Sequence, residues 1–322
     1  MDVLSDVLAI MRTGRPRSAQ VTWHAPWAQR FAPVPGAVGF HVILRGSCWL
    51  MQPGADPLPL SAGDVVFRPH GRGHTLADDP STRPVAPACH PNEPAALRRY
   101  AVDTVGAPSG DGGPAAVVLC GAYELDPALV HPLLHDLPEL VHIPAHLGRR
   151  PELRATVDLL AAELAQPRPG ADALIPALLD TLLLYILRSW FDRRPAPRAT
   201  GWAAALNDPA VAAALQAMHD DPARPWTVAA LAAEAGLSRA PFARRFTALL
   251  GQPPLTYLTW WRLTAAARLL RQSDAPLNVI AGRVGYTSSF AFANAFKRRY
   301  GTAPGRYRGR GRRAAEPAGV KK

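Results

Sequence analysis

Histidines in two short stretches are the residues of this chain that could bind a metal. The stretch GDVVFRPHGRGH (residues 63–74) holds His70 and His74, and the earlier stretch GFHVILRGSCWLMQ (residues 39–52) holds His41. A metal site needs three or four ligands in a fixed geometry. His41 and His74 are only two, although His70 could add a third. The alternatives are a metal site and histidines without metal; the sequence favours the second, so we predict no metal and no cofactor.

The cysteines are the other reactive side chains. Three of them in 322 residues (Cys48, Cys89 and Cys120) form no disulfide framework and are typical of a reducing cytosol. Cys120 follows an apolar run, which predicts a buried and unreactive thiol. Cys89 lies among Pro, Ala and His in a loop-like stretch and is the more exposed candidate. Cys89 and Cys120 are therefore the candidate redox residues.

Short strands and turns are predicted to position these side chains. From Val21 to about Leu125, apolar or alternating segments such as DVVFRPH and AAVVLCGAYEL are separated by Gly, Pro and Asp. Many short strands at this spacing predict a small barrel or jelly roll, and such a barrel encloses a cavity that can hold one small ligand. The side chains predicted to line this effector pocket are Trp23, His41, Trp49, His70 and His74.

Two helices are predicted after the barrel, over residues 151–166 and 172–191. The second is apolar beyond one stripe, so it should be covered on more than one side. Asp180 and Arg188 within it argue against a membrane span. The helix pair is the predicted dimer seam, with packing against its own barrel as the alternative. The predicted apolar stripes are Leu153, Val157, Leu160 and Leu164 in the first helix, and Leu174, Leu178, Leu182 and Tyr185 in the second.

The last third of the chain contains one motif twice. GLSRAPFARRFTALLGQPPLTYL from Gly236 matches GYTSSFAFANAFKRRYGTAPGRYR from Gly285. The first Gly recurs at an offset of forty-nine, and the rings and the later Gly and Pro recur at an offset of fifty. Each copy predicts an apolar-periodic helix, a Gly turn, a hydroxyl cap and a second helix with rings at i and i+4. Such a pair is a helix-turn-helix, and its duplication indicates a repeated structural unit. The rings predicted to be core are Phe242, Phe246, Phe292 and Phe296.

The positive charge of the chain lies with this motif. Residues 201–322 hold 18 Lys and Arg against 6 Asp and Glu, a net +12, whereas residues 1–200 hold 18 against 19, a net −1. A basic helix-turn-helix is the electrostatic footprint of a nucleic-acid binder. DNA is favoured over RNA, because a helix fits the major groove of B-form DNA and not that of A-form RNA. The predicted partner is therefore double-stranded DNA.

Residues 206–308 resemble the DNA-binding domain of AraC/XylS-type transcription regulators. The resemblance lies in VAALAAEAGLS, the FARRF helix, GQPPLTYL, the linking WRLTAAARLL and the second copy VIAGRVGYTSSFAFANAFKRRYGTAPGRYR. It implies two helix-turn-helix units joined by one long helix, here about residues 254–271. The two reading helices would then enter successive major grooves on one face of DNA.

The strand-rich part is similar to a cupin barrel, the effector-sensing domain of many such regulators. Gly63, Pro69, Gly71 and His74 have the spacing of the second cupin signature. The His-x-His pair and Glu of the first signature are missing, which counts against cupin metal chemistry. The Cys120-Gly121 dipeptide and the later LLHDLPELVHI are similar to a short-form subgroup that includes sensors of electrophiles or oxidants.

The resemblance and the ring positions together divide the outward faces of the reading helices by role. Asn294 can bond adenine in bidentate fashion, and Phe290 can contact a thymine methyl, with core packing as its alternative. Basic residues at or beyond a helix end are expected to meet phosphate. The predicted base contacts are Ala240, Ala243, Arg244, Ser289, Phe290, Ala291 and Asn294. The predicted phosphate contacts are Ser238, Arg239, Arg245, Ser288, Lys297, Arg298, Arg299, Arg306 and Arg308.

The expected architecture is an α+β multidomain protein: a cupin-like β-barrel with a helical pair, then an all-α domain with two helix-turn-helix motifs. The predicted segments are a sensing domain (1–145), a dimerisation segment (146–194), a linker (195–205), the DNA-binding domain (206–308) and a disordered basic tail (309–322). We expect a cytoplasmic, homodimeric transcription regulator with a small-molecule or redox effector, no membrane partner, and RNA polymerase as partner if it activates. The alternatives are a cupin metalloenzyme fused to a DNA-binding domain, and an architectural DNA binder without effector.

Overall fold

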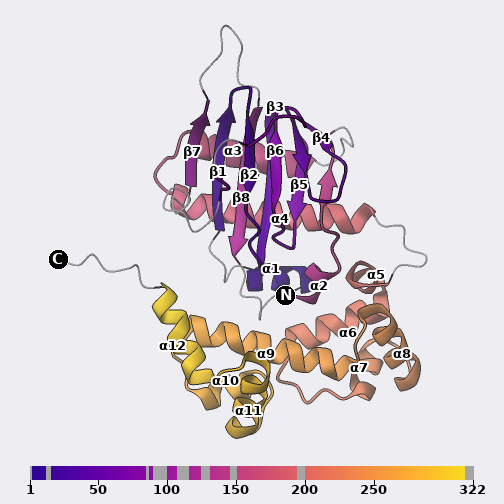
Figure 1. Cartoon of the computed structure of the whole chain (residues 1–322). Coiled ribbons are helices and arrows are strands. Elements are labelled where there is room, and N and C mark those ends of the chain that lie inside the picture. The colour runs from indigo at the N-terminus through magenta and orange to yellow at the C-terminus, as the bar shows by residue number, and fades with distance from the viewer. Residues whose placement is uncertain are drawn as a thin grey trace, which may run out of the picture. The chain divides into compact units, whose positions relative to one another are not determined.

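The computed structural model divides into two compact units. The β unit is Met11–Arg193, and the helical unit combines Met1–Ile10 with Arg194–Lys322 (Figure 1). The N-terminal ten residues thus group with the helical unit, whereas the sequence placed them in the sensing domain 1–145. The structure describes residues 2–11, 16–84, 87–89, 100–106, 116–124, 131–145, 151–193 and 200–315.

In the described part of the β unit, nine strands form one curled sheet, a half-barrel. The pairing order is β2-β6-β3-β8-β1-β7; β4 and β5 also pair with β3, and β9 pairs with β5. Among the described strand pairs, only β1 and β7 run parallel, while the neighbours of β3 run antiparallel to it. The strands are β1 (Pro16–Trp23), β2 (Ala28–Phe31), β3 (Ala37–Met51), β4 (Leu58–Ser61), β5 (Val65–Arg68), β6 (His74–Ala77), β7 (Tyr100–Val105), β8 (Ala116–Glu124) and β9 (Val141–Ile143).

The long strand β3 organises the half-barrel. Its first half pairs with β5 and β8, its second half pairs with β4 and β6, and the register shifts between Ile43 and Arg45. Such a bulge bends a strand, which lets one strand serve both parts of a curled sheet. Gly121 is needed on the neighbouring strand β8, because a Cβ there would lie 2.1 Å from the Phe40 ring. The Cys-Gly dipeptide singled out in the sequence thus makes room for a core ring.

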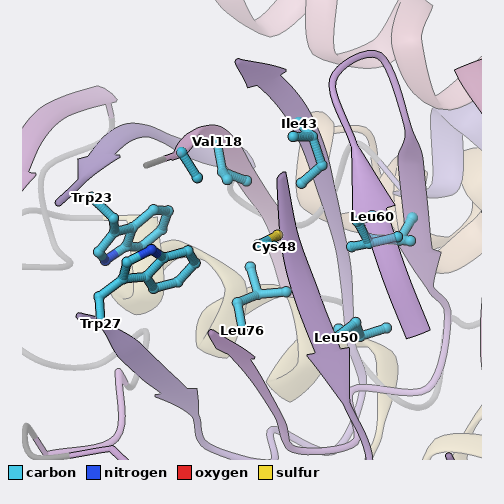
Figure 2. Packing of buried hydrophobic residues seen from close by; sticks show 10 residues of the cluster. Trp23, Trp27, Ile43, Cys48, Leu50, Leu60, Leu76 and Val118 are labelled. Atoms are coloured by element: carbon cyan, nitrogen blue, oxygen red, sulfur yellow. The ribbon is translucent and has the colours of Figure 1, made fainter. Parts of the chain in front are cut away.

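The interior of the half-barrel is an apolar cluster. Strand residues such as Ile43, Cys48 and Leu50 of β3 point into it, and the rings of Trp23 and Trp27 stack at 4.6 Å at one end (Figure 2). These side chains are nearly inaccessible to water. At about 25 cal/mol per Å² of apolar surface, their burial is the main stabilisation of the sheet.

Helices α2 (Pro132–His135), α3 (Pro151–Ala165) and α4 (Ala171–Arg193) complete the β unit. The predicted stripe of α3 is buried, whereas in that of α4 Leu182 is buried but Leu174 is 44% exposed, and Leu178 and Tyr185 are half-buried. A helix that is apolar nearly all round gives no periodic signal for one face. By length and composition alone α4 could cross a membrane, and 56% of the relevant window is buried within the structure. The buried face of α4 comprises Ile175, Leu179, Leu182, Leu183, Ile186 and Leu187.

The helical unit contains the duplicated motif as predicted. The first repeat is α7 and α8, the second is α10 and α11, and the 19-residue helix α9 links them. Gly251 and Gly301 end the second helix of each repeat at φ of 70° and 67°, a conformation that favours glycine. The helices are α1 (Val3–Met11), α5 (Trp202–Asn207), α6 (Pro209–Asp220), α7 (Val228–Glu234), α8 (Arg239–Leu250), α9 (Pro254–Gln272), α10 (Leu277–Arg283), α11 (Ser289–Tyr300) and α12 (Pro304–Ala315).

A buried polar chain attaches α1 to the helical unit. An Asp6 carboxylate oxygen lies 2.8 Å from Nδ1 of His219, whose Nε2 lies 2.6 Å from the Tyr257 hydroxyl. The His219 ring also stacks on Trp261 at 3.9 Å. Because buried polar groups need partners, Asp6 is the residue that fixes α1 here. No local pattern could show this contact, since Asp6 and His219 are 213 positions apart.

Two segment boundaries differ from the prediction. The linker was expected over 195–205, but α5 begins at Trp202, whose buried ring packs 5.4 Å from Tyr257; residues 195–199 lie outside the described residues. The tail was expected to be disordered from 309, but α12 continues to Ala315. Arg and Ala are good helix formers and outweigh the two glycines of this segment. The rest of the tail lies outside the described residues.

Candidate nucleic-acid interface and half-barrel interior

Helix α8 presents one buried and one open face. Phe242 and Phe246 are buried, as predicted, while Ala240 and Arg244 are exposed and Ala243 is half-buried. The rings therefore anchor the helix, and the side chains between them remain available on the surface. The role of that surface in reading bases stays a prediction.

Helix α11 repeats this arrangement with one addition. Phe292 and Phe296 are buried, whereas the neighbouring Phe290 is 76% exposed. The alternative that Phe290 packs in the core is therefore wrong. Ser289, Ala291 and Asn294 are also exposed, so four residues on the outer part of this helix form an open surface. A large exposed ring beside polar side chains is a feature of interaction surfaces.

The predicted phosphate contacts are exposed, except for the half-buried Arg308. Three of the arginines among the nine have an internal partner that limits their freedom, and the Ser288 hydroxyl oxygen accepts from the Ala291 N–H at 3.3 Å. Arg245 forms an ion pair with Asp208, and Arg299 lies over the Trp260 ring at 5.7 Å. Arg308 donates to the Ala275 carbonyl oxygen at 2.6 Å, which makes it partly a structural residue.

Comparison with known proteins identifies the family. A cupin family model matches residues 2–192, and a helix-turn-helix domain model matches residues 231–310. An AraC-like transcription regulator of Streptomyces lividans is 39% identical over 310 residues, which is 96% of this chain and 98% of that protein. The chain belongs to the AraC-like transcription regulators.

Two further proteins are similar to this AraC-like regulator. The HTH-type transcriptional regulator AlkR of Acinetobacter baylyi is 31% identical over 96% of this chain and 99% of its own. The DNA-binding domain of AdpA, a global transcriptional factor solved in complex with a target DNA, is 38% identical. It covers 35% of this chain and 99% of that chain, with a TM-score of 0.32. The family models and the full-length relatives confirm the predicted family, fold class and function as a transcription regulator.

Inside the half-barrel of this AraC-like regulator, three polar side chains form a chain of contacts. Nδ1 of His41 lies 3.1 Å from Sγ of Cys120, and Nε2 of His41 lies 2.6 Å from Nε2 of His74. The Phe31 ring stacks on His74 at 4.6 Å. His41 and His74, two of the predicted lining residues, are thus brought together, and Cys120 joins them.

Electrostatics keep this chain neutral. Burial lowers the pKa of His41 to about 3, and the positive charge of Arg68 adds to this effect. The pKa of His74 is lowered for the same first reason, with smaller contributions from His41 and Arg68. Burial raises the pKa of the Cys120 thiol far above its usual range, and the neighbouring Cys89 and Cys48 add to the shift. Cys120 is half-buried rather than buried as predicted, and its raised pKa leaves it a protonated, weakly nucleophilic thiol.

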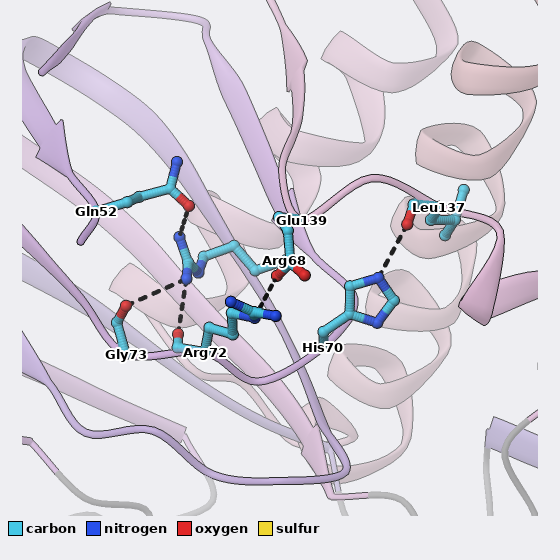
Figure 3. Close-up of polar contacts among 7 residues, drawn as sticks. All are labelled: Gln52, Arg68, His70, Arg72, Gly73, Leu137 and Glu139. Carbon is cyan, nitrogen blue, oxygen red and sulfur yellow. Dashed lines mark hydrogen bonds and ion pairs between the residues drawn. The ribbon is translucent and has the colours of Figure 1, made fainter. Parts of the chain in front are cut away.

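The structure separates the other predicted pocket residues. Trp23 lies in the interior cluster, but Trp49 lies between Cys48 and Leu50, which both point inward, so strand alternation turns Trp49 outward. His70 donates to the Leu137 carbonyl oxygen at 2.9 Å and is directed towards the segment after α2 (Figure 3). Trp49 therefore lies on the opposite face of β3 from its neighbours Cys48 and Leu50, and it is not one of the residues of the interior cluster.

Sequence reasoning missed the buried arginine of the motif FRPH. Arg68 is almost inaccessible, and its guanidinium donates to Gln52 Oε1 at 2.8 Å and to the Arg72 carbonyl oxygen at 2.7 Å (Figure 3). Burial lowers the pKa of Arg68 to about 10. Strand alternation could have indicated this burial, because Arg68 follows the buried Val66 by two residues and lies on the same face of β5.

Two predicted chemistries can be compared with this geometry. Cys89 is half-buried, and its backbone pairs with β2 through Arg30 and Ala32. Among the residues that the structure describes, no group of three His, Cys, Asp or Glu side chains converges as a metal site would require. What the interior does offer is a set of unpaired donors: the Nε1 atoms of Trp23 and Trp27 and the Nε atom of Arg68 have no hydrogen-bond partner in the described residues.

Proposed function

We propose that this AraC-like regulator reads its operator with α8 and α11, each placed in a major groove. The observation that carries the proposal is Phe290, a ring that is 76% exposed on a helix whose other phenylalanines are buried. Exposing a ring of this size to water is unfavourable by about 1.5–3 kcal/mol relative to burying it, so a binding partner is expected to cover it. A thymine methyl in the major groove is such a partner, and the neighbouring Asn294 supplies the polar contact.

The two faces of the reading helices are expected to respond differently to substitution. Arg244→Ala and Asn294→Ala should each weaken binding to the cognate operator by about 1–3 kcal/mol and relax the base preference at one position. Arg306→Ala should weaken binding to all sequences alike and reduce the salt slope by about one unit, because it removes a phosphate contact.

Binding-site selection followed by a salt titration on each full-length variant tests this division. Arg306→Ala serves as the charge-matched control for Arg244→Ala, since each removes one exposed arginine from the helical unit. A changed motif for Arg306→Ala, combined with an unchanged motif for the other two variants, would show that the two faces have been assigned the wrong way round.

For the half-barrel we propose a signal-sensing role, with a small molecule or an oxidant as effector. The supporting features are the neutral Cys120–His41–His74 chain and the unpaired buried donors of Trp23, Trp27 and Arg68. A buried donor without an acceptor is unfavourable by about 1–3 kcal/mol. An effector with acceptor atoms, such as a carboxylate or carbonyl compound, would relieve that penalty. Oxidation of Cys89 or Cys120 is the alternative input.

Replacing both His41 and His74 with alanine should abolish the response of the target promoter to its inducer. A reporter strain screened with small molecules and with oxidants would supply that inducer. Trp49→Phe is the matched control, because Trp49 points away from the interior. A normal response in the double variant would refute the assignment of this interior as the sensing site.

We further propose a non-enzymatic, cytoplasmic homodimer that recruits RNA polymerase where it activates. The similar proteins are named transcription regulators, which supports a regulatory role over the alternative of a cupin metalloenzyme. The presence of a cupin domain of nearly 200 residues favours an effector-responsive regulator over an architectural DNA binder. Two exposed leucines on the helix pair, Leu159 and Leu174, favour a second copy of the chain as the partner of that face.

A further inference from the structure

Arg262 of the linking helix α9 holds a loop of the first helix-turn-helix repeat. Its Nε donates to the Pro222 carbonyl oxygen at 2.7 Å, and its Nη2 donates to the Arg224 carbonyl oxygen at 2.8 Å. Two donors of one planar guanidinium on two carbonyls fix both the position and the orientation of this loop. The loop, residues 221–226, leads directly into α7.

The loop is itself rigidly connected to the first repeat. Asp221 accepts from the backbone N–H groups of Ala223 and Arg224, both at 3.1 Å, and Trp226 donates from Nε1 to the Asp221 carbonyl oxygen at 2.8 Å. Arg224 then forms an ion pair with Glu234 of α7. A displacement of the loop would therefore be transmitted to α7 and, through its packing, to the reading helix α8.

The other side of Arg262 contacts the second repeat. A Cβ on Gly285, in the turn between α10 and α11, would lie 2.7 Å from Nη2 of Arg262 and 2.8 Å from the Pro222 carbonyl oxygen. The next residue, Tyr286, packs edge-on against Phe292 of α11 at 5.6 Å. The turn that precedes the second reading helix is thus in direct contact with Arg262 and with the loop of the first repeat.

This contact breaks the symmetry of the duplication. Gly236 is the counterpart of Gly285 in the first repeat and also has a positive φ, 64° against 80°. A Cβ on Gly236 would meet no atom within 4 Å. The close approach at Gly285 is therefore not a general requirement of the turn, and it belongs to the contact between the repeats. We call the contacts of Arg262 with Pro222, Arg224 and Gly285 the Arg262 clamp.

We propose that the Arg262 clamp is a positioning device that fixes the distance and rotation between the two reading helices, and thereby selects operators by the spacing of their two contacted segments. The inference rests on the proposed reading role of α8 and α11. Each added base pair rotates the second contacted segment by about 35° about the DNA axis. Only a pair of helices held in a fixed arrangement can therefore reject an operator with one extra base pair. When two binding modules are linked, the effective concentration of the second is highest if the link matches the distance between their two sites on the DNA. A looser link lowers this maximum and allows binding over a wider range of spacings.

The test uses full-length protein and operators with altered spacing. The starting operator comes from binding-site selection with the unmodified chain, and derivatives carry one or two base pairs inserted or deleted between the two contacted segments. Dissociation constants are measured by fluorescence anisotropy at one salt concentration. We expect the unmodified chain to lose about 100-fold in affinity per inserted base pair. Arg262→Ala should bind the starting operator about tenfold more weakly and lose no more than about tenfold on insertion.

Matched variants separate the clamp from charge and from backbone strain. Arg268→Ala removes another arginine of α9, one that makes no hydrogen bond or ion pair within the described residues. This variant should keep the original spacing profile, which is the dependence of affinity on operator spacing. Gly285→Ala and Gly236→Ala both place an alanine at positive φ, but only the first should flatten the profile. Arg262→Lys, which keeps the charge and loses the two-pronged geometry, should give an intermediate profile; it also serves if Arg262→Ala does not fold.

The outcomes distinguish the clamp from the function on which it rests. If Arg262→Ala or Arg262→Lys loses affinity by one factor at every spacing, Arg262 acts only through stability or charge and the proposal is overturned. The same holds if Gly285→Ala retains the original profile. If the unmodified chain selects no operator at all, it is the reading role of α8 and α11 that has failed.

Discussion

Raising the salt concentration from 50 to 200 mM is expected to weaken operator binding by this AraC-like regulator by about 10³-fold. Residues 201–322 carry a net +12, and nine of their side chains are predicted phosphate contacts. Seven of the nine are Lys or Arg, and Arg245 and Arg308 are held by internal partners. Binding would therefore release on the order of five counterions, and each contributes about 0.9 to the slope of log affinity against log salt.

A matched substitution locates the effect within the chain. Arg154 is an exposed arginine of the β unit, whose residues carry almost no net charge. Arg154→Ala should therefore leave the salt slope unchanged, whereas Arg306→Ala lowers it. Fluorescence anisotropy with the full chain and a labelled operator gives both slopes. Binding that is insensitive to salt, or a slope that follows Arg154, would contradict the assignment of DNA binding to the helical unit.

The helical unit could be predicted closely because its signals are local. Rings at i and i+4, a glycine after each helix and one long linking helix depend on neighbours in sequence. The structure places the linking helix over Pro254–Gln272, against the expected 254–271. The sequence placed Phe290 on the outward face with core packing as the alternative, since a phenylalanine in a helix is also a normal core residue; its 76% exposure decides between the two. Arg262 had no sequence signal, because its partners are backbone carbonyls about forty positions away.

The β unit was predicted in class but less well in detail, because its contacts are distant in sequence. The spacing of Gly63 and His74 indicated a cupin-like sheet, yet the register shift in β3 and the pairing with β8 decide which side chains meet. His41 and Cys120 are 79 positions apart, so their contact could not be derived from spacing. Trp49 was assigned to the interior because a tryptophan in an apolar stretch is a common pocket residue. Residue type alone does not show which face of the strand it occupies.

Lowering the pH from 7 to 5 is expected to destabilise the β unit by about 2 kcal/mol for each buried histidine that stays neutral in the fold. Burial lowers the pKa of His41 to about 3, against an unfolded value near 6.5, and lowers that of His74 in the same direction. Between those values the unfolded chain binds a proton that the folded chain does not. The free energy of unfolding is therefore fully maintained above about pH 6.5 and falls as the pH drops towards 3, by about 1.4 kcal/mol per pH unit and histidine.

The test is urea unfolding of the chain at several pH values. In each sample, pulsed hydrogen exchange at one fixed labelling pH then reports how far the peptides of β3 and β8 have unfolded. His135→Asn is the control, because His135 is exposed at the end of α2 and its loss should leave the pH dependence intact. His41→Asn combined with His74→Asn should flatten the pH dependence, even if the double variant is less stable at pH 7.

Because Arg68 opposes a charge on both imidazoles, an effector with a carboxylate bound near Arg68 would raise the pKa values of His41 and His74. Such an effector should therefore reduce the acid sensitivity, whereas stability that is constant or increases down to pH 5 without effector would show that the His41–His74 pair accepts a proton in the fold.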